Sequence, residues 1–366
     1  MNENRKFVYS AIVVFIVFFF NNCTQRDPNS VNWDAIEFHL VGDIVHTNDP
    51  FLRGLYSPVI IENYIITRAL RSELIFRLSQ LRNDSLVYIG DFLSKGRGPA
   101  EMMSPTLHYA ASSNQIVIYD NLSNDKVFYI DAANIQNVFT TNSWKLININ
   151  HIRNFTYLYP LADYTFLGLL PIQRKATKQM FYYIDLNGIY GLNLLFPTDN
   201  SVITDSYQKL QAYKGKIEKH PSTNRFVYFS EMNRYMHIFD FTPDSLITVS
   251  TPYTEYPRYS LAADRMNIDR DGDNYVGPIT FYAGDKHIYI LMNNATYTHL
   301  REEKLIDGYP WNMSNCVYIF DWEGNPVKKY VLDHFVRSIF VDSKEQYIYG
   351  YADGDESIKL FRYTMK

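Results

Sequence analysis

The sequence predicts an all-β fold, and more specifically a six-bladed β-propeller with four-stranded antiparallel blades. Three observations lead to this prediction. After residue 30, no long segment keeps a convincing 3.6-residue apolar period. Short runs rich in Val, Ile, Tyr and Phe recur instead, and turn residues separate them. A tetrapeptide of three strand-forming residues followed by Asp also returns along the chain, as expected for an array of similar small sheets.

The composition supports a folded protein and excludes several classes. The chain has 366 residues, of which 46% are hydrophobic, and it contains 31 Tyr, 24 Phe and 4 Trp. Disorder is excluded because so much apolar surface can compensate chain entropy by burial. The formal net charge of −4 argues against broad phosphate neutralisation, so we expect no nucleic-acid partner. Two cysteines are too few for a disulfide scaffold.

The N-terminus has the pattern of an export signal. Arg5 and Lys6 precede an apolar run over 7–20, which is shorter than the roughly 20 residues needed to span a bilayer. The run ends close to Cys23, and a polar stretch follows. This pattern resembles a bacterial lipoprotein signal, which implies that Cys23 is lipidated and that the protein is anchored to a membrane of the bacterial cell envelope. We therefore expect three regions: a signal peptide over 1–22, a tether over 23–32 and the propeller over 33–366.

An uncleaved N-terminal anchor is the alternative interpretation of the apolar run. The chain would then be the extracellular half of a sensor, and its body would still lie outside the cytoplasm. If Cys23 is lipidated, Cys316 is the only other thiol, so an internal disulfide is excluded. Cys316 lies in a strand-like segment, which favours a buried, unreactive side chain.

The repeated tetrapeptide indicates the length of one blade. It occurs at Phe128–Asp131, Tyr182–Asp185, His237–Asp240 and Tyr318–Asp321. The first two intervals between the aspartates are about 55 residues and the third is about 80, a period in the range of propeller blades. A further strand precedes each copy and a turn follows it, so we expect the aspartates to bond backbone N–H groups of the turns rather than to act in catalysis.

Counting these units predicts six blades. The first begins with strands near 64–68 and 74–78, four units carry the tetrapeptide, and the sixth runs from about 335 to the end. The sixth unit is one strand short, whereas the N-terminal segment 36–41 is a strand without a partner. We expect these two to pair and close the ring, because closure removes two free sheet edges.

A segment rich in glycine identifies a family resemblance. The stretch 89–101 reads Ile-Gly-Asp-Phe-Leu-Ser-Lys-Gly-Arg-Gly-Pro-Ala-Glu. It resembles the Gly-x-Gly-Pro-Gly-Glu-Phe segment of six-bladed propeller proteins of the NHL-like and TolB-like kind, particularly exported lipoproteins. Ala100 and Met102 stand where that segment has Gly and Phe. The resemblance implies the six-bladed fold and an envelope location, and it implies no shared activity.

Three charged or long loops are predicted on one face of the propeller, where ligands often bind. The Gly-Pro segment over 91–103 carries Lys95, Arg97 and Glu101, and its alternative role is a simple blade-to-blade turn. The loop over 171–179 carries Arg174 and Lys178 and is either an anion site or a solvated loop tip.

The third loop, over 293–315, explains the long interval between aspartates and is the strongest site candidate. It carries His299, Arg301 and Trp311, which a ligand could contact. A short helical decoration over 298–306, packed on the rim, is the alternative.

Metal and catalytic motifs are weak in this sequence. Asp269, Asp271 and Asp273 alternate in a turn and could direct oxygens at calcium, but the segment lacks the Gly and Glu of an EF-hand and also suits a plain turn. No zinc motif and no Gly-x-Ser-x-Gly elbow occurs. His108, Arg153 and Arg337 fall near innermost strands, where a structural hydrogen bond is the favoured role.

These observations favour a non-catalytic binding or scaffolding propeller. We expect a monomer with no cofactor other than a possible calcium ion, anchored to a membrane by its N-terminus and binding a small ligand or a protein partner on the loop face. The alternative is a propeller lyase or hydrolase acting on saccharides or peptides. Convergence of His, Tyr and carboxylate side chains on the mouth of the central channel, within hydrogen-bond reach, would favour the alternative.

Overall fold

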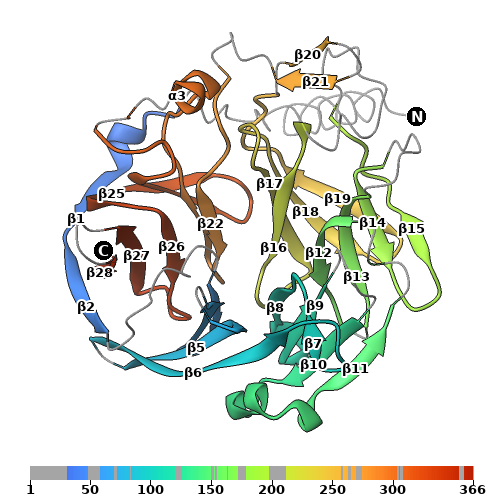
Figure 1. The fold of residues 1–366 in the computed structure, drawn as a ribbon. Helices are drawn as coiled ribbons and strands as arrows, with labels where there is room; N and C mark the ends of the chain where they lie inside the picture. Colours follow the sequence, from blue (N-terminus) through green and yellow to red (C-terminus); the bar gives the residue numbers. More distant parts are fainter. Residues whose placement is uncertain are drawn as a thin grey trace, which may run out of the picture.

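The computed structural model describes residues 31–47, 58–69, 72–82, 84–120, 126–149, 152, 155–162, 164–171, 179–197, 212–256, 259–262, 265–268, 274–302, 305, 308–353 and 358–365. Within these residues, strands form six four-stranded antiparallel units, which we call blades 1 to 6 in chain order: blades 2, 3 and 4 are separate sheets, blade 5 belongs to a five-stranded sheet, and blades 6 and 1 are parts of one nine-stranded sheet. The blades surround a common axis (Figure 1), and the innermost strands of successive blades contact one another from blade 1 to blade 6. The predicted six-bladed propeller is confirmed.

In each of the first three blades, the strands follow one another from the axis outward. Blade 1 contains β3 (Val59–Ile61), β4 (Tyr64–Arg68), β5 (Leu74–Arg82) and β6 (Ser85–Lys95). Blade 2 contains β8 (Thr106–Ala110), β9 (Gln115–Tyr119), β10 (Lys126–Asp131) and β11 (Lys145–Asn148). Blade 3 contains β12 (Phe155–Pro160), β13 (Phe166–Pro171), β14 (Phe181–Ile184) and β15 (Ile189–Gly191).

Blades 4 and 5 repeat this order, and blade 6 takes its fourth strand from the N-terminus. Blade 4 contains β16 (Gly215–Lys219), β17 (Arg225–Ser230), β18 (Met236–Thr242) and β19 (Ser245–Ser250). Blade 5 contains β22 (Thr280–Ala283), β23 (His287–Leu291), β24 (Ser314–Asp321) and β25 (Pro326–Val336). Blade 6 contains β26 (Ser338–Val341), β27 (Tyr347–Asp353), β28 (Ile358–Thr364) and β2 (Gly42–Thr47).

Short elements complete the described part of the chain. They are the 3₁₀ helices η2 (Trp33–Ile36), η4 (Ala111–Ser113), η5 (Ile135–Phe139) and η6 (Thr141–Ser143), the strands β1 (Glu37–Leu40), β7 (Glu101–Met102), β20 (Tyr259–Ala262) and β21 (Arg265–Ile268), and the helix α3 (Tyr297–Arg301). None of the helices described is long and apolar enough to cross a bilayer.

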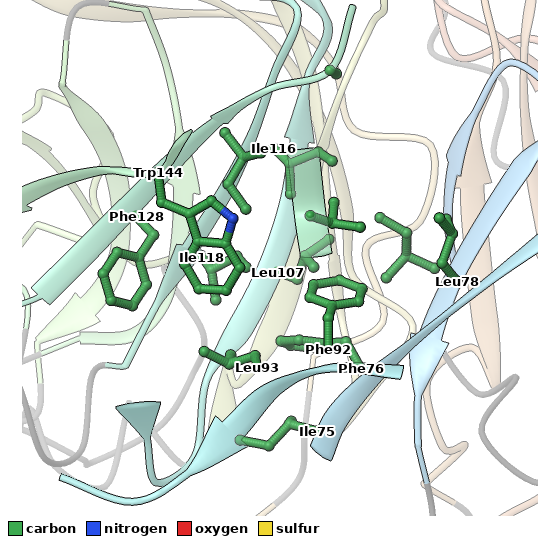
Figure 2. Close-up of a cluster of buried hydrophobic side chains, with 14 of the residues drawn as sticks. Ile75, Phe76, Leu78, Phe92, Leu93, Leu107, Ile116, Ile118, Phe128 and Trp144 are labelled. Atoms are coloured by element: carbon green, nitrogen blue, oxygen red, sulfur yellow. The ribbon is translucent and has the colours of Figure 1, made fainter. Parts of the chain in front are cut away.

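The core lies between the faces of adjacent blades. Second strands such as β9 and β17 are buried along almost their whole length, because a neighbouring blade covers each of their two faces. Figure 2 shows the cluster between blades 1 and 2, where Phe76 and Phe92 face Leu107 and Ile116. Burying each large apolar side chain contributes about 1.5–3 kcal/mol, so these inter-blade clusters hold the ring together.

An N-terminal strand closes the ring, as predicted, but the closing strand is β2 rather than the segment 36–41. β2 pairs antiparallel with β28, whereas β1 pairs in parallel with β25 of blade 5. Gly42 starts β2, and a Cβ there would lie 2.7 Å from the ring of Tyr363, so the absence of a side chain permits this close approach. β2 then pairs in parallel with β6 and joins blade 6 to blade 1.

Three of the four repeated aspartates cap turns, as predicted. Oδ1 of Asp131, Asp185 and Asp321 accepts hydrogen bonds from backbone N–H groups two to four residues further on. Asp240 differs, because its two carboxylate oxygens accept hydrogen bonds from Arg225, at 2.8 and 3.1 Å. Asp240 therefore pairs with the Arg225 guanidinium on the neighbouring strand instead of capping a turn.

Two insertions lengthen the chain between Asp240 and Asp321. One is the predicted loop between β23 and β24, which contains α3 and ends where β24 begins at Ser314. The alternative interpretation of this loop, a short helix over 298–306, agrees with α3 at Tyr297–Arg301. The other insertion, the β20–β21 hairpin between blades 4 and 5, was not identified from the sequence.

Candidate functional site

The two faces of the propeller differ in what they present. Loops between the second and third strands of a blade, together with the blade-to-blade connections, form the loop face, where the described parts of the Gly-Pro segment and of the loop between β23 and β24 lie. Turns between the first and second strands and between the third and fourth strands form the opposite face, which we call the turn face. Two clefts open on the turn face, one between blades 5 and 6 and one between blades 4 and 5.

The cleft between blades 5 and 6 has a volume of about 290 Å³ and contains a hydrogen-bonded cluster. Glu345 lies in the turn between β26 and β27, with φ of 51°, and its side chain is 5% exposed. Its Oε2 accepts from the hydroxyl of Tyr289 at 2.8 Å and lies 3.0 Å from Nδ1 of His287. Its Oε1 accepts from the backbone N–H of Lys286 at 2.6 Å.

These contacts determine the ionisation of Glu345. Burial acts to raise the pKa of its carboxyl, but the hydrogen bonds from His287, Lys286 and Tyr289 outweigh burial and hold the pKa below its ordinary value. Burial and the nearby negative charge of Glu345 raise the pKa of Tyr289. Glu345 is therefore a carboxylate at neutral pH, and Tyr289 is a neutral hydrogen-bond donor.

The rest of this cleft combines cationic and apolar side chains. Two lysines, Lys286 and Lys328, line it beside His287. Its apolar lining consists of Ile319, Val327, Tyr330 and Met365. Val327 and Met365 are only partly buried, so they give the cleft an apolar, accessible wall.

The cleft between blades 4 and 5 has a volume of about 540 Å³ and shares Lys286 with its neighbour. Arg225 spans its floor, forming ion pairs with Asp240 and with Glu323, each at 2.8–2.9 Å. Ser222 donates to Asp285 at 2.6 Å. Most charges described in this cleft therefore already have a partner of opposite sign or a hydrogen bond.

His220 forms one wall of the cleft between blades 4 and 5. Its ring packs on Trp322 with centroids 4.9 Å apart. Burial lowers the pKa of His220, and the nearby Asp285 acts in the opposite direction.

A third polar group lies on the innermost strands, near the axis. Lys216 and Glu218 alternate along β16 and point away from Ile217, which is buried in the core between blades 3 and 4. Burial raises the pKa of Glu218 to about 7, although the positive charge of Lys216 acts in the opposite direction. The carboxyl keeps a small exposed surface, but the surrounding inner strands remove most of its water.

Three tyrosines on neighbouring inner strands surround Glu218. Burial, followed by the negative charge of Glu218, raises the pKa of Tyr157, Tyr159 and Tyr282. His108, on β8, is buried with Nε2 3.3 Å from the hydroxyl of Tyr119, and burial lowers its pKa to about 3. This group is enclosed, so the clefts of the turn face are the more accessible sites.

The residues predicted on the loop face have mixed environments. In the Gly-Pro segment, Lys95 and Arg97 are exposed, whereas Glu101 accepts a hydrogen bond from the N–H of Gly98 at 2.8 Å. A Cβ on Gly98 would lie 3.0 Å from the Glu101 carboxyl, so glycine permits this internal contact. The Glu101 carboxylate thus already accepts the backbone N–H that a bound anion would need.

The loop between β23 and β24 is tied down by its own polar groups. His299 lies in α3, and its Nδ1 accepts the backbone N–H of Thr296 at 3.2 Å as part of a capping box. Arg301 ends α3. Trp311 is 37% exposed, and its carbonyl accepts from the side chain of Asn293 at 2.6 Å. Trp311 is therefore accessible to a ligand at the rim of this loop.

Several predicted sites lie outside the described residues. They are the lipidation site Cys23, the basic residues Arg174 and Lys178, the channel candidate Arg153, and the calcium candidates Asp269, Asp271 and Asp273. In the part of the chain that is described, no cluster of His, Cys, Asp and Glu could hold a metal ion. Arg337 is half-buried between β25 and β26.

The sequence analysis missed the cluster of His287, Tyr289 and Glu345. His287 and Tyr289 alternate on one strand, which predicts a shared face, but Glu345 comes from the next blade. A turn glutamate has no distinguishing local signal, so only the packing of blade 5 against blade 6 brings these groups together.

Comparison with known proteins agrees with the geometry. No curated protein sequence matches this chain. A protein from Bacteroides fragilis described as exported has a similar solved structure, with a TM-score of 0.52, 14% identity, and coverage of 92% of this chain and 98% of the other. A member of the duf4221 family from Bacteroides vulgatus has a TM-score of 0.48 and 11% identity, covering 84% and 91%. TolB from Acinetobacter baumannii has a TM-score of 0.38 and 13% identity, covering 82% and 63%.

The sequence also matches a family model directly. The model of the TolB-like 6-blade propeller-like family matches residues 75–344, most of the chain, which include blades 2 to 5 in whole and blades 1 and 6 in part. Together with the six blades, this match gives the family: the chain belongs to the TolB-like six-bladed propellers.

Proposed function

We propose that this protein is an exported, lipid-anchored propeller that binds a small ligand or a protein partner without transforming it. One observation carries the proposal: two clefts share Lys286 on the turn face, where polar groups from blades 4, 5 and 6 converge. Concave sites with a few convergent polar groups are typical of ligand binding. The binding surface proposed here thus lies opposite the predicted loop face.

The envelope location is supported by the N-terminal sequence and by one structural relative. The basic and apolar segments before Cys23 suit a lipoprotein signal. The similar protein from Bacteroides fragilis is described as exported. A lipid on Cys23, with the short tether that follows, would keep the propeller next to the membrane.

Anchoring is tested by replacing Cys23 with alanine. We expect the wild-type protein to carry lipid and to sediment with membranes, and the Cys23→Ala variant to lose the lipid label. Cys316→Ala serves as the matched control, because that side chain lies in β24 and should not affect lipidation. Mass spectrometry of the native N-terminus measures the outcome, and an unmodified Cys23 in mature protein would refute the lipoprotein assignment.

Ligand binding is tested by a thermal-shift screen of the full chain with oligosaccharides and peptides. A ligand that binds only the folded state stabilises it by about 2.7 kcal/mol at a concentration of 100 Kd, and this stabilisation raises the midpoint temperature of unfolding. We expect Lys286→Glu to remove most of the shift, because Lys286 lines both clefts. Lys359→Glu, an exposed change on β28 outside both clefts, should leave the shift unchanged. Equal shifts in both variants would place binding elsewhere.

A second candidate function is a lyase or hydrolase, and the cluster at His287 favours it. A histidine whose Nδ1 faces a buried carboxylate can present its other nitrogen as a general base. The same screen separates the two functions. Recovery of the bound compound unchanged supports a binding protein, whereas conversion that disappears in His287→Gln supports the enzyme.

A further inference from the structure

Among the described residues that line the cleft between blades 5 and 6, Glu345 supplies the one carboxylate, and its oxygens accept hydrogen bonds from within the protein. Oε1 of Glu345 accepts a hydrogen bond from the backbone N–H of Lys286. Its Oε2 accepts hydrogen bonds from the hydroxyl of Tyr289 and from Nδ1 of His287. Its side chain is only 5% exposed. Glu345 therefore orients His287 and Tyr289. Because its carboxylate is buried and hydrogen-bonded, a ligand in the cleft contacts little of its negative charge.

The contact with Glu345 determines how His287 faces the cleft. A carboxylate only accepts hydrogen bonds, so Nδ1 of His287 must carry a proton. Within the described structure, Nε2 of His287 makes no hydrogen bond, and the His287 side chain is 30% exposed. Because the Nδ1 edge of the ring is held against buried Glu345, the opposite edge with Nε2 faces the accessible space of the cleft.

The remaining charges on the described cleft wall are positive. Lys286 and Lys328 line the cleft with His287, and Glu345 is the only carboxylate among the described lining residues. The neighbouring cleft between blades 4 and 5 has a mixed character, because Arg225 there is paired with Asp240 and Glu323. The cleft between blades 5 and 6 therefore favours a negatively charged group.

The apolar lining residues of the cleft suit the non-ionic part of such a ligand. Ile319 and Tyr330 form a buried apolar base, and Val327 and Met365 are partly exposed beside it. A volume of about 290 Å³ lies at the lower end of the range for small-molecule pockets, roughly 300–1,000 Å³. The space suits a small molecule with one ionic end rather than a peptide or a long oligosaccharide.

We propose that the cleft between blades 5 and 6 binds a small organic anion, with its carboxylate at the ammonium group of Lys286 and at His287 in its imidazolium form, in which Nε2 also donates, and with its apolar body against Val327 and Met365. Glu345 positions His287 for this contact. The inference rests on the binding function proposed above and names the chemistry of one ligand.

The test uses the full chain in detergent, labelled with ¹³C at Cε1 of histidine, and benzoate as the probe. The chain has nine histidines, and loss of one signal in His287→Gln assigns the resonance of interest. We expect benzoate to shift the His287 signal saturably and to leave His220, in the neighbouring cleft, unchanged. Lys286→Gln should weaken benzoate binding about tenfold, because it removes a charge-assisted contact.

Benzamide, which has the same shape without the charge, is the matched control. If it shifts the His287 signal as strongly as benzoate does, the anion assignment is wrong while binding at this cleft stands. If neither benzoate, acetate nor glucuronate shifts that signal at millimolar concentrations, the inference is overturned. The thermal-shift screen then still decides separately whether the protein binds other ligands on the turn face.

Discussion

Replacing Arg77 with methionine is expected to destabilise the protein by about 3–5 kcal/mol, the range for breaking a buried ion pair by removing one partner. Arg77 on β5 faces Asp91 directly across the sheet on β6. Its Nε and Nη2 donate to the two carboxylate oxygens of Asp91 at 2.8 and 3.0 Å. The side chains are only 7% and 10% exposed, so water would compensate little of the charge left on Asp91.

Urea unfolding measures this effect, and two variants make the result specific. The double variant Arg77→Met, Asp91→Leu should recover most of the lost stability, because it removes both buried charges. Lys214→Met breaks the more exposed pair with Glu231, whose side chains are 59% and 30% exposed, and should cost less than about 1 kcal/mol. A loss of similar size in Arg77→Met and Lys214→Met would contradict the buried-pair interpretation.

The second large effect is a pH dependence that originates at Glu218. Burial raises the pKa of its carboxyl in the folded protein from the ordinary value of 4.5 to about 7. Between these values the folded state keeps a proton that the unfolded state has lost, so stability falls as pH rises through this window. The loss should reach about 3 kcal/mol above pH 7, at about 1.36 kcal/mol for each pKa unit. Below the ordinary value, both states are protonated and no penalty remains.

Glu218→Gln should abolish this dependence because an amide does not ionise. We expect wild type and Glu218→Gln to have similar free energies of unfolding near pH 4.5, and the variant to be more stable by about 3 kcal/mol at pH 8. Glu73→Gln, which changes an exposed carboxyl, should follow the wild-type curve. If the free energy of unfolding changed with pH in the same way in wild type and Glu218→Gln, the Glu218 carboxyl would be better solvated than its position implies.

The strands of the blades and the number of blades were predictable from the sequence because the signals are local. Val, Ile, Tyr and Phe favour strands through their own shape, and turn residues mark the strand ends. The recurring Asp also reports a local event at Asp131, Asp185 and Asp321, where it bonds a turn a few residues away. A repeated local pattern was therefore enough to predict six similar blades.

The prediction of the strand that closes the ring was wrong because two neighbouring segments have equivalent local patterns. The segments Glu37–Leu40 and Gly42–Thr47 are both short strands that bury one apolar residue, Leu40 or Val45. Which segment completes blade 6 depends on packing against Tyr363 and β28, residues more than 300 positions away. No pattern within either segment shows which of the two pairs with β28.

The sequence by itself determined the fold class, the number of blades and the N-terminal signal pattern, because each depends on residues close together in the chain. Only the tertiary structure decided where the clefts lie and which groups meet in them. Glu345 reaches His287 from the neighbouring blade, and the inner strands of other blades enclose Glu218. Burial and Coulomb interactions depend on distance in space, and the closing of the ring sets those distances.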